Sequence, residues 1–139
     1  TCLEGADILV EASRLERPEP LLKTAWIRPG ALVVPYGTMS ALEPDVLDAI
    51  DKVVVDDWGQ AGVGPFGALR RQVDEGRLTA TSLHAELGQI VAGLRPGREQ
   101  PQERILFWHR GLSLSDIALG ALVLARARER GVGRSLPYA

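Results

Sequence analysis

The sequence has a single cysteine, Cys2, and no excess of basic residues. One cysteine cannot form an internal disulfide, so we expect no disulfide scaffold and predict a cytoplasmic location. Sixteen lysines and arginines stand against eighteen acidic residues, which gives a formal net charge of -2. Nucleic-acid binding normally needs a basic stripe that neutralises phosphates, so no nucleic-acid partner is expected.

The sequence also lacks a long hydrophobic run. Its most apolar stretch near the end is IALGALVLA, residues 117–125, whereas a membrane-spanning helix needs about 20 apolar residues. We therefore expect no membrane partner. The opening TCLEGAD has no initiator methionine and no basic secretory start, which predicts that the chain is part of a longer protein.

No G-x-G-x-x-G motif follows a strand-like run. Gly62 and Gly64 come after such a run, but Pro65 removes a backbone donor, and no third glycine has the required spacing. We interpret this segment as a flexible loop. The helical neighbours of His84 carry no metal ligand, so no metal site is expected.

The sequence does contain a series of short apolar runs that end at turn residues. Such runs are typical of strands in a parallel sheet, and each leads toward a helical pattern. We predict strands at residues 6–13, 31–37, 52–58 and 104–109, with helices at 43–50, 67–76 and 85–92. This alternation predicts an α/β fold with an open, mostly parallel, doubly wound sheet.

The last element, at about residues 114–130, has the clearest helix signals. Ser113 or Ser115 can cap its start, Asp116 suits its positive end, and Gly131 can terminate it. Apolar and small side chains between residues 114 and 125 share one broad face. We expect this face to pack closely against another helix.

Two adjacent acids, Asp56 and Asp57, follow the third predicted strand. Paired acids after a strand also occur in receiver domains, where they hold Mg²⁺. Such a domain also needs a lysine at the end of a later strand, and none is present. We therefore interpret both acids as capping the next turn and facing water.

Six stretches in order carry a resemblance to a known family. They are GADILVEAS, RPGALVVPYG, KVVVDDW, GALRRQVDEG, LHAELGQIVAGLRPGR and HRGLSLSDIALGALVLARARERGVG. Together they resemble the C-terminal half of the ornithine cyclodeaminase and mu-crystallin family. The resemblance implies that residues 1–112 are the second half of an NAD(P)-binding Rossmann-like domain. Residues 113–139 would then be a helix and tail that return to a substrate and dimerisation domain.

The resemblance also implies an activity and its partners. Family members use NAD or NADP, act on amino acids or cyclic imines, and are homodimers. We expect the complete protein to be such an oxidoreductase and this chain alone to be inactive, because the glycine-rich nucleotide turn belongs to the absent half. The alternative is a non-catalytic, truncated module that serves dimerisation or partner docking. Only the enzyme predicts a cleft lined by Ser13, Gly37 and His109.

The resemblance places the nicotinamide end of the cofactor beside three turns. The residues implied at these turns are Ala12, Ser13, Gly37, Thr38, His109, Arg110 and Gly111. In the cyclodeaminase itself, the second turn carries an acid/base aspartate where Thr38 stands. A threonine cannot exchange a proton near neutral pH as a carboxylate can, so imine reduction or amino-acid dehydrogenation is favoured over ornithine cyclodeamination.

Three residues near the last strand have two interpretations each. His109 can donate a proton near neutral pH or bond only to nearby backbone. Arg110 can grip a carboxylate or phosphate with two donors, or be solvated or paired with an acid. Asp116 can belong to the catalytic site or only stabilise the helix start.

Overall fold

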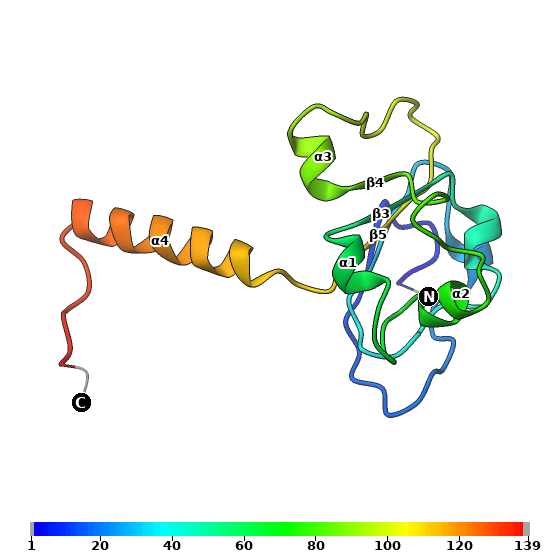
Figure 1. Ribbon diagram of the computed structural model, residues 1–139, viewed down its shortest axis with the longest axis horizontal. Helices are drawn as coiled ribbons and strands as arrows, with labels where there is room; N and C mark the ends of the chain where they lie inside the picture. The colour runs from blue at the N-terminus through cyan, green and yellow to red at the C-terminus, as the bar shows by residue number, and fades with distance from the viewer. Residues whose placement is uncertain (1, 138–139) are drawn as a thin grey trace.

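The computed structural model describes residues 2–137 of the chain and contains one five-stranded parallel sheet (Figure 1). Its strands are β1 (Ile8–Glu11), β2 (Leu32–Pro35), β3 (Lys52–Val55), β4 (Ala85–Glu86) and β5 (Ile105–Trp108). They lie in the order β1-β2-β5-β3-β4, and every pairing is parallel. The predicted α/β fold and its four strands are therefore confirmed, and β4 is an addition.

The helices between the strands are short. They are η1 (Thr24–Trp26), η2 (Val46–Ala49), α1 (Trp58–Ala61), α2 (Arg70–Asp74) and α3 (Leu87–Val91). The prediction of a helix at 85–92 was wrong at its start, because Ala85 pairs with Val54 in the sheet before the chain turns into α3. The helix predicted at 43–50 is the 3-10 helix η2, and that predicted at 67–76 shrinks to α2.

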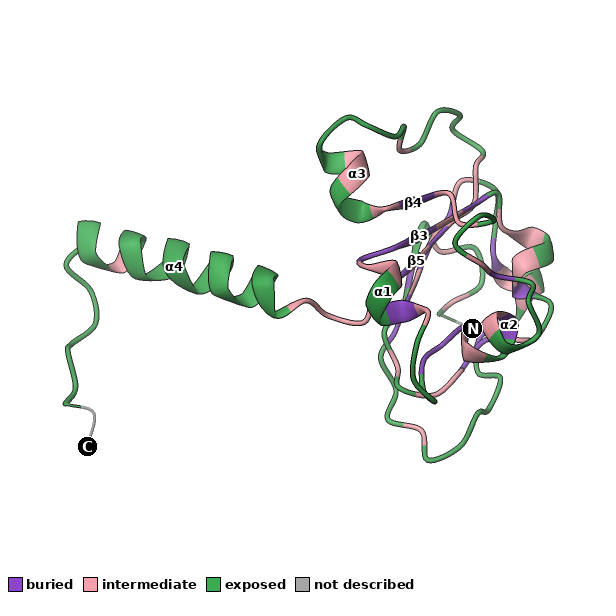
Figure 2. Cartoon of the chain, in the orientation of Figure 1, coloured by how far each residue is buried: buried purple, intermediate pink, exposed green. Residues whose placement is uncertain are grey.

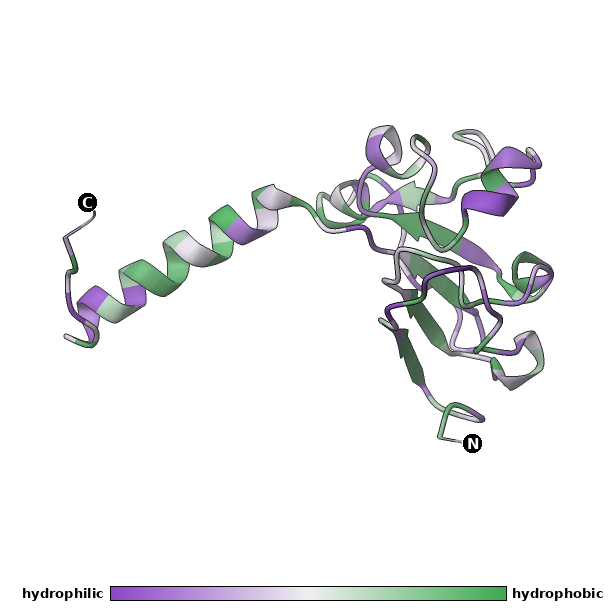
Figure 3. Ribbon diagram, turned by 90° about the horizontal axis from the view of Figure 1, so that it is seen from below, coloured by the Kyte–Doolittle hydropathy of each residue, from purple (hydrophilic) through white to green (hydrophobic). Residues whose placement is uncertain are grey.

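The two faces of the sheet differ in how they are covered. Leu9, Val33, Leu106 and Trp108 point to one face and form the core with the segments that join β1 to β2, β2 to β3 and β3 to β4. On the opposite face of the edge strand β1, Ile8 is 62% exposed and Val10 is 59% exposed. Figure 2 shows buried residues along the strands, and in Figure 3 most short helices and loops lie on one side of the strands. Parallel sheets are normally covered on both faces, but residues 2–137 provide no layer over this face of β1.

A buried lysine fixes the loop before β5. Lys52 Nζ at the start of β3 donates to Gly97 O at 2.8 Å and to Glu99 Oε2 at 2.7 Å, and it lies 3.0 Å from Glu103 Oε1. Burial alone would lower the pKa of Lys52, but its hydrogen bonds to Glu99 and Glu103 outweigh burial and raise that pKa. The Glu99 backbone N–H and the Lys52 ammonium lower the pKa of Glu103.

The lowered pKa of Glu103 predicts an acid-sensitive fold. A carboxyl group whose pKa falls on folding stabilises the native state above its unfolded pKa, and this stability is lost as pH falls through the folded pKa. The ordinary pKa of this group is 4.5. We therefore expect the Tm of the complete protein to decrease as the pH is lowered below about 4.5. In Glu103→Gln, the Tm should decrease less steeply over the same pH range. Thermal melts across pH measure this, with exposed Glu19→Gln as the control. Equal slopes in all three proteins would contradict it.

The last helix, α4 (Ser113–Glu129), leads away from the sheet (Figure 1). Its N-cap residue is Leu112, and no side chain caps it, so the predicted cap by Ser113 or Ser115 was wrong. The predicted packing against another helix is also not seen within the described residues. Ile117 is 69% exposed and Leu122 is 54% exposed. In residues 2–137 we find no helix with the length and apolarity that a bilayer span requires.

Candidate functional site

Three turns lie in a row at the carboxyl ends of β1, β2 and β5. The register pairs Glu11 with Pro35 and Val33 with Leu106, so the chain leaves these three adjacent strands at nearly the same level. The turns hold residues 12–13, 36–38 and 109–111, which are the three that the sequence suggested. Ligands of open α/β sheets bind outside the carboxyl ends of the strands, so this row is the candidate site.

Asp56 ties the third turn to β3. Its side chain is 1% exposed, and its Oδ2 accepts hydrogen bonds from the backbone N–H groups of Arg110 at 2.7 Å and Gly111 at 2.8 Å. Its Oδ1 accepts the N–H of Asp57 at 3.0 Å. The prediction that Asp56 faces water was therefore wrong, because the buried carboxylate satisfies three backbone donors. Asp57 does cap the next helix, since its Oδ1 accepts the N–H of Gln60.

His109 stands against the same carboxylate. Its Nδ1 lies 3.0 Å from Asp56 Oδ2, but Nδ1 has no hydrogen-bond partner among the described residues. The imidazole also lies 5.2 Å from the Tyr36 ring and 5.4 Å from the Phe107 ring, centre to centre. These contacts orient a half-buried imidazole at the carboxyl edge and leave Nε2 outside the contact with Asp56. The interpretation in which His109 bonds only to nearby backbone does not account for these contacts.

Arg110 turns back toward α1. Its Nη1 donates to the carbonyls of Gln60 and Val63, both at 3.2 Å. The guanidinium therefore donates to backbone oxygens. This partner differs from those considered from the sequence, which were a carboxylate or phosphate of a ligand, solvent, or an acidic side chain. Gly111 adopts φ +87°, which other residues rarely do. A Cβ there would make only an ordinary contact with Tyr36 Oη, at 3.6 Å. The backbone conformation, and not a lack of space, therefore favours glycine at this position.

The first two turns are joined through Glu11, the last residue of β1. Its Oε1 accepts the N–H of Ser13 at 2.6 Å. A Cβ on Gly37 would lie 2.7 Å from Glu11 Oε2, so a side chain at position 37 would require the Glu11 carboxylate to move. Ala12 and Thr38 are exposed beside them, and the Thr38 carbonyl accepts the N–H of Gly67 at 2.8 Å.

The remaining sequence candidate, Asp116, is not in this row. It is exposed on the first turn of α4, which leads away from the sheet. Sequence reasoning missed Glu11 and the true position of Asp56. Both are acids directly at the end of an apolar run, and that position was the available signal.

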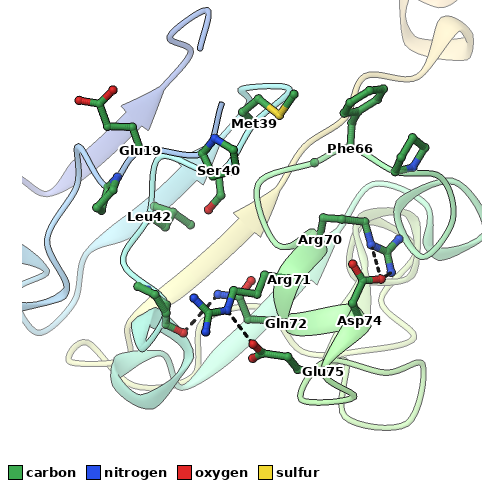
Figure 4. A pocket seen from close by; sticks show the side chains of 15 residues that line it. Glu19, Met39, Ser40, Leu42, Phe66, Arg70, Arg71, Gln72, Asp74 and Glu75 are labelled. Carbon is green, nitrogen blue, oxygen red and sulfur yellow. Dashed lines mark hydrogen bonds and ion pairs between the residues drawn. The ribbon is translucent and has the colours of Figure 1, made fainter. Parts of the chain in front are cut away.

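A pocket of about 510 Å³ lies elsewhere, between residues 18–20, 39–44 and 65–75 (Figure 4). Ser13, Gly37 and His109 do not line it, so the cleft expected from the sequence is not this one. Its two arginines are already engaged, because Arg70 pairs with Asp74 and Arg71 with Glu75. We therefore place the candidate site at the three turns. Residues 2–137 contain no cluster of side chains suited to a metal ion.

Comparison with known proteins identifies a family and several relatives. The sequence model of the ornithine cyclodeaminase/mu-crystallin family matches residues 1–131. A Delta(1)-pyrroline-2-carboxylate reductase of Bacillus cereus is 34% identical over 139 residues, which cover 98% of this chain and 42% of that protein.

Two solved structures share the fold. The Delta(1)-pyrroline-2-carboxylate reductase of Thermococcus litoralis, in complex with NADH and L-proline, has a TM-score of 0.79 and 32% identity over 96% of this chain and 42% of its own. An archaeal alanine dehydrogenase dimer with bound NAD has a TM-score of 0.75 and 28% identity over 96% of this chain and 41% of its own.

This chain therefore spans about two fifths of the length of these relatives. The match over residues 1–131 confirms the resemblance noted in the sequence. The chain belongs to the ornithine cyclodeaminase/mu-crystallin family.

Proposed function

We propose that the complete protein carrying this chain is an NAD(P)-dependent oxidoreductase that reduces a cyclic imine or, in reverse, oxidises an amino acid. The observation that carries the proposal is the Asp56–His109 pair at the carboxyl edge of a parallel sheet. Relatives that reduce Delta(1)-pyrroline-2-carboxylate or carry bound NAD support the same class of reaction. The proposal includes a cytoplasmic location, which rests on the single cysteine and the nature of the substrate.

The three turns would hold the nicotinamide end of NAD or NADP. The residues assigned to it are Ala12, Ser13, Gly37, Thr38, His109, Arg110 and Gly111. Gly37, where a Cβ would have to displace the Glu11 carboxylate, lies on the second of these turns. The dinucleotide phosphates would be held by residues outside this chain. When bound, the nicotinamide supplies the hydride.

His109 would supply the proton. Reduction of an imine adds a hydride to carbon and a proton to nitrogen, so the site needs one acid near neutral pH. With Asp56 Oδ2 lying 3.0 Å from Nδ1, Nε2 would be the nitrogen that donates to the imine nitrogen. In the oxidative direction, Nε2 would take a proton from the amino group. Asp116 is a weaker catalytic candidate, because it lies on α4 away from the row.

The open surfaces support a division of the complete protein. We assign residues 1–112 to the nucleotide-binding domain, with its open sheet face covered by upstream helices. Residues 113–139 would return to the substrate and dimerisation domain, because the apolar side chains of α4 are exposed on all sides. This exposure also supports the second candidate function, in which the chain is a non-catalytic module that dimerises or docks through α4.

The activity assay uses the complete protein with NADH or NADPH and Delta(1)-pyrroline-2-carboxylate. We expect imine-dependent oxidation of one cofactor and formation of proline, and no conversion of ornithine because Thr38 cannot replace an acid/base. If the protein bound neither cofactor and turned over no cyclic imine or amino acid, the proposed enzyme function would be rejected. The non-catalytic docking module would then be the remaining candidate function.

Placing a charge on α4 should disrupt the homodimer. Leu122→Asp would place a carboxylate in an apolar interface, which is strongly unfavourable, so we expect dissociation or loss of the folded protein. Light scattering after gel filtration measures the mass, with exposed Arg128→Ala on the same helix as the control. A Leu122→Asp protein that stays a folded dimer would contradict the assignment of α4 to an interface.

A further inference from the structure

Glu11 is a buried acid that the proposed mechanism does not use. It ends the edge strand β1 and is only 7% exposed. A charge is rarely buried unless it is paired or hydrogen-bonded, because leaving water is costly. Its place at the candidate site therefore calls for an explanation.

The two carboxylate oxygens of Glu11 have different surroundings. Oε1 accepts the Ser13 N–H at 2.6 Å. Oε2 is buried and has no hydrogen-bond partner among the described residues. It fills the space beside Gly37, where a Cβ would lie 2.7 Å away. The unsatisfied oxygen thus lies between the first and second turns of the site.

No cation in the described chain neutralises this group. The ion pairs that the structure records within residues 2–137 involve other acids, and none includes Glu11. The Glu11 backbone carbonyl accepts the Tyr36 N–H at 2.7 Å, which holds the end of β1 against the second turn. The Glu11 side chain therefore lies at the site without a cation beside it among residues 2–137.

We propose that Glu11 makes the site prefer the oxidised, positively charged nicotinamide over the neutral reduced form. This inference rests on the proposed function, which places the nicotinamide beside Ser13 and Gly37. A carboxylate attracts a neighbouring pyridinium more strongly where water is displaced, whereas the reduced ring carries no charge to attract. Glu11 is thus a positioning and electrostatic residue, distinct from the proton donor His109.

The test compares the dissociation constants of the oxidised and reduced cofactor in the complete protein. Calorimetry or fluorescence titration measures both without turnover. Glu11→Gln keeps the shape and an acceptor for Ser13 but removes the charge. We expect it to weaken binding of the oxidised form by about tenfold relative to the reduced form. Glu16→Gln removes an exposed charge from the same loop and should leave the ratio unchanged.

A second neutral variant guards against misfolding. Glu11→Thr suits a strand end and retains a hydroxyl acceptor, so it should shift the ratio in the same direction. If the neutral variants weaken both forms equally or leave both unchanged, Glu11 is only structural and this inference is overturned. If the unaltered protein binds neither form, the proposed function fails as well.

Discussion

Replacing His109 with alanine should lower kcat for imine reduction by about a hundredfold or more, the range lost with a general acid. Binding of the reduced cofactor should change far less, because His109 lies on only one of the three turns that form the proposed cofactor-binding surface. The physical reason is the Asp56–His109 contact, which holds the imidazole at the carboxyl edge of the sheet, where a histidine can act as the acid. Steady-state kinetics of the complete protein, with separate titration of cofactor binding, measures both effects.

His84 provides the matched control, because it is the other histidine of the chain. It precedes β4, where its Nε2 contacts the Pro96 carbonyl at 2.9 Å, and it is not part of the three turns. His84→Ala should therefore leave kcat near that of the unaltered protein. If His109→Ala retained full kcat, or His84→Ala lost as much, the proton donor would have to be another group.

Replacing Asp56 with alanine should destabilise the complete protein by about 3 kcal/mol or more. The substitution leaves three partly buried backbone N–H groups without their acceptor, and an unsatisfied buried group costs about 1–3 kcal/mol before the structure relaxes. It also removes the anchor that holds the turn at 109–111 to β3, so activity should fall with stability. Denaturant unfolding at neutral pH measures the loss.

The adjacent acid makes the comparison sharp. Asp57 caps only the four-residue helix α1 through Gln60, and loss of an N-cap costs about 1 kcal/mol. Asp57→Ala should therefore be much milder than Asp56→Ala. Similar losses for the two variants would show that Asp56 does not anchor the turn.

Much of the fold could be predicted from the sequence because its main signals are local. The runs ILVE, LVVP, KVVV and ILFW each became a parallel strand. In contrast, β4 has only two residues, Ala85 and Glu86, and no periodicity can be seen over so short a stretch. It becomes a strand only because Val54 and Val55 offer an edge to pair with.

The site was only partly predictable, for a related physical reason. The three turns were suggested by the resemblance, and parallel pairing puts them side by side. The inward position of Asp56 depends on the backbone N–H groups of residues 110 and 111. These residues lie in the turn after β5, far from Asp56 in the sequence. The same holds for Glu11, whose Oε2 lies 2.7 Å from where a Cβ of residue 37 would stand. The position of both acids at the end of an apolar run was visible in the sequence, but the backbone groups and the glycine that they meet were not.

The most direct measurement of the central claim is a crystal structure of the complete protein with NADH bound. The account predicts that the nicotinamide ring lies against the turns at residues 12–13, 36–38 and 109–111, with His109 Nε2 facing the substrate side. A nicotinamide bound away from these turns, or a His109 ring turned away from it, would contradict the proposed site and its proton donor.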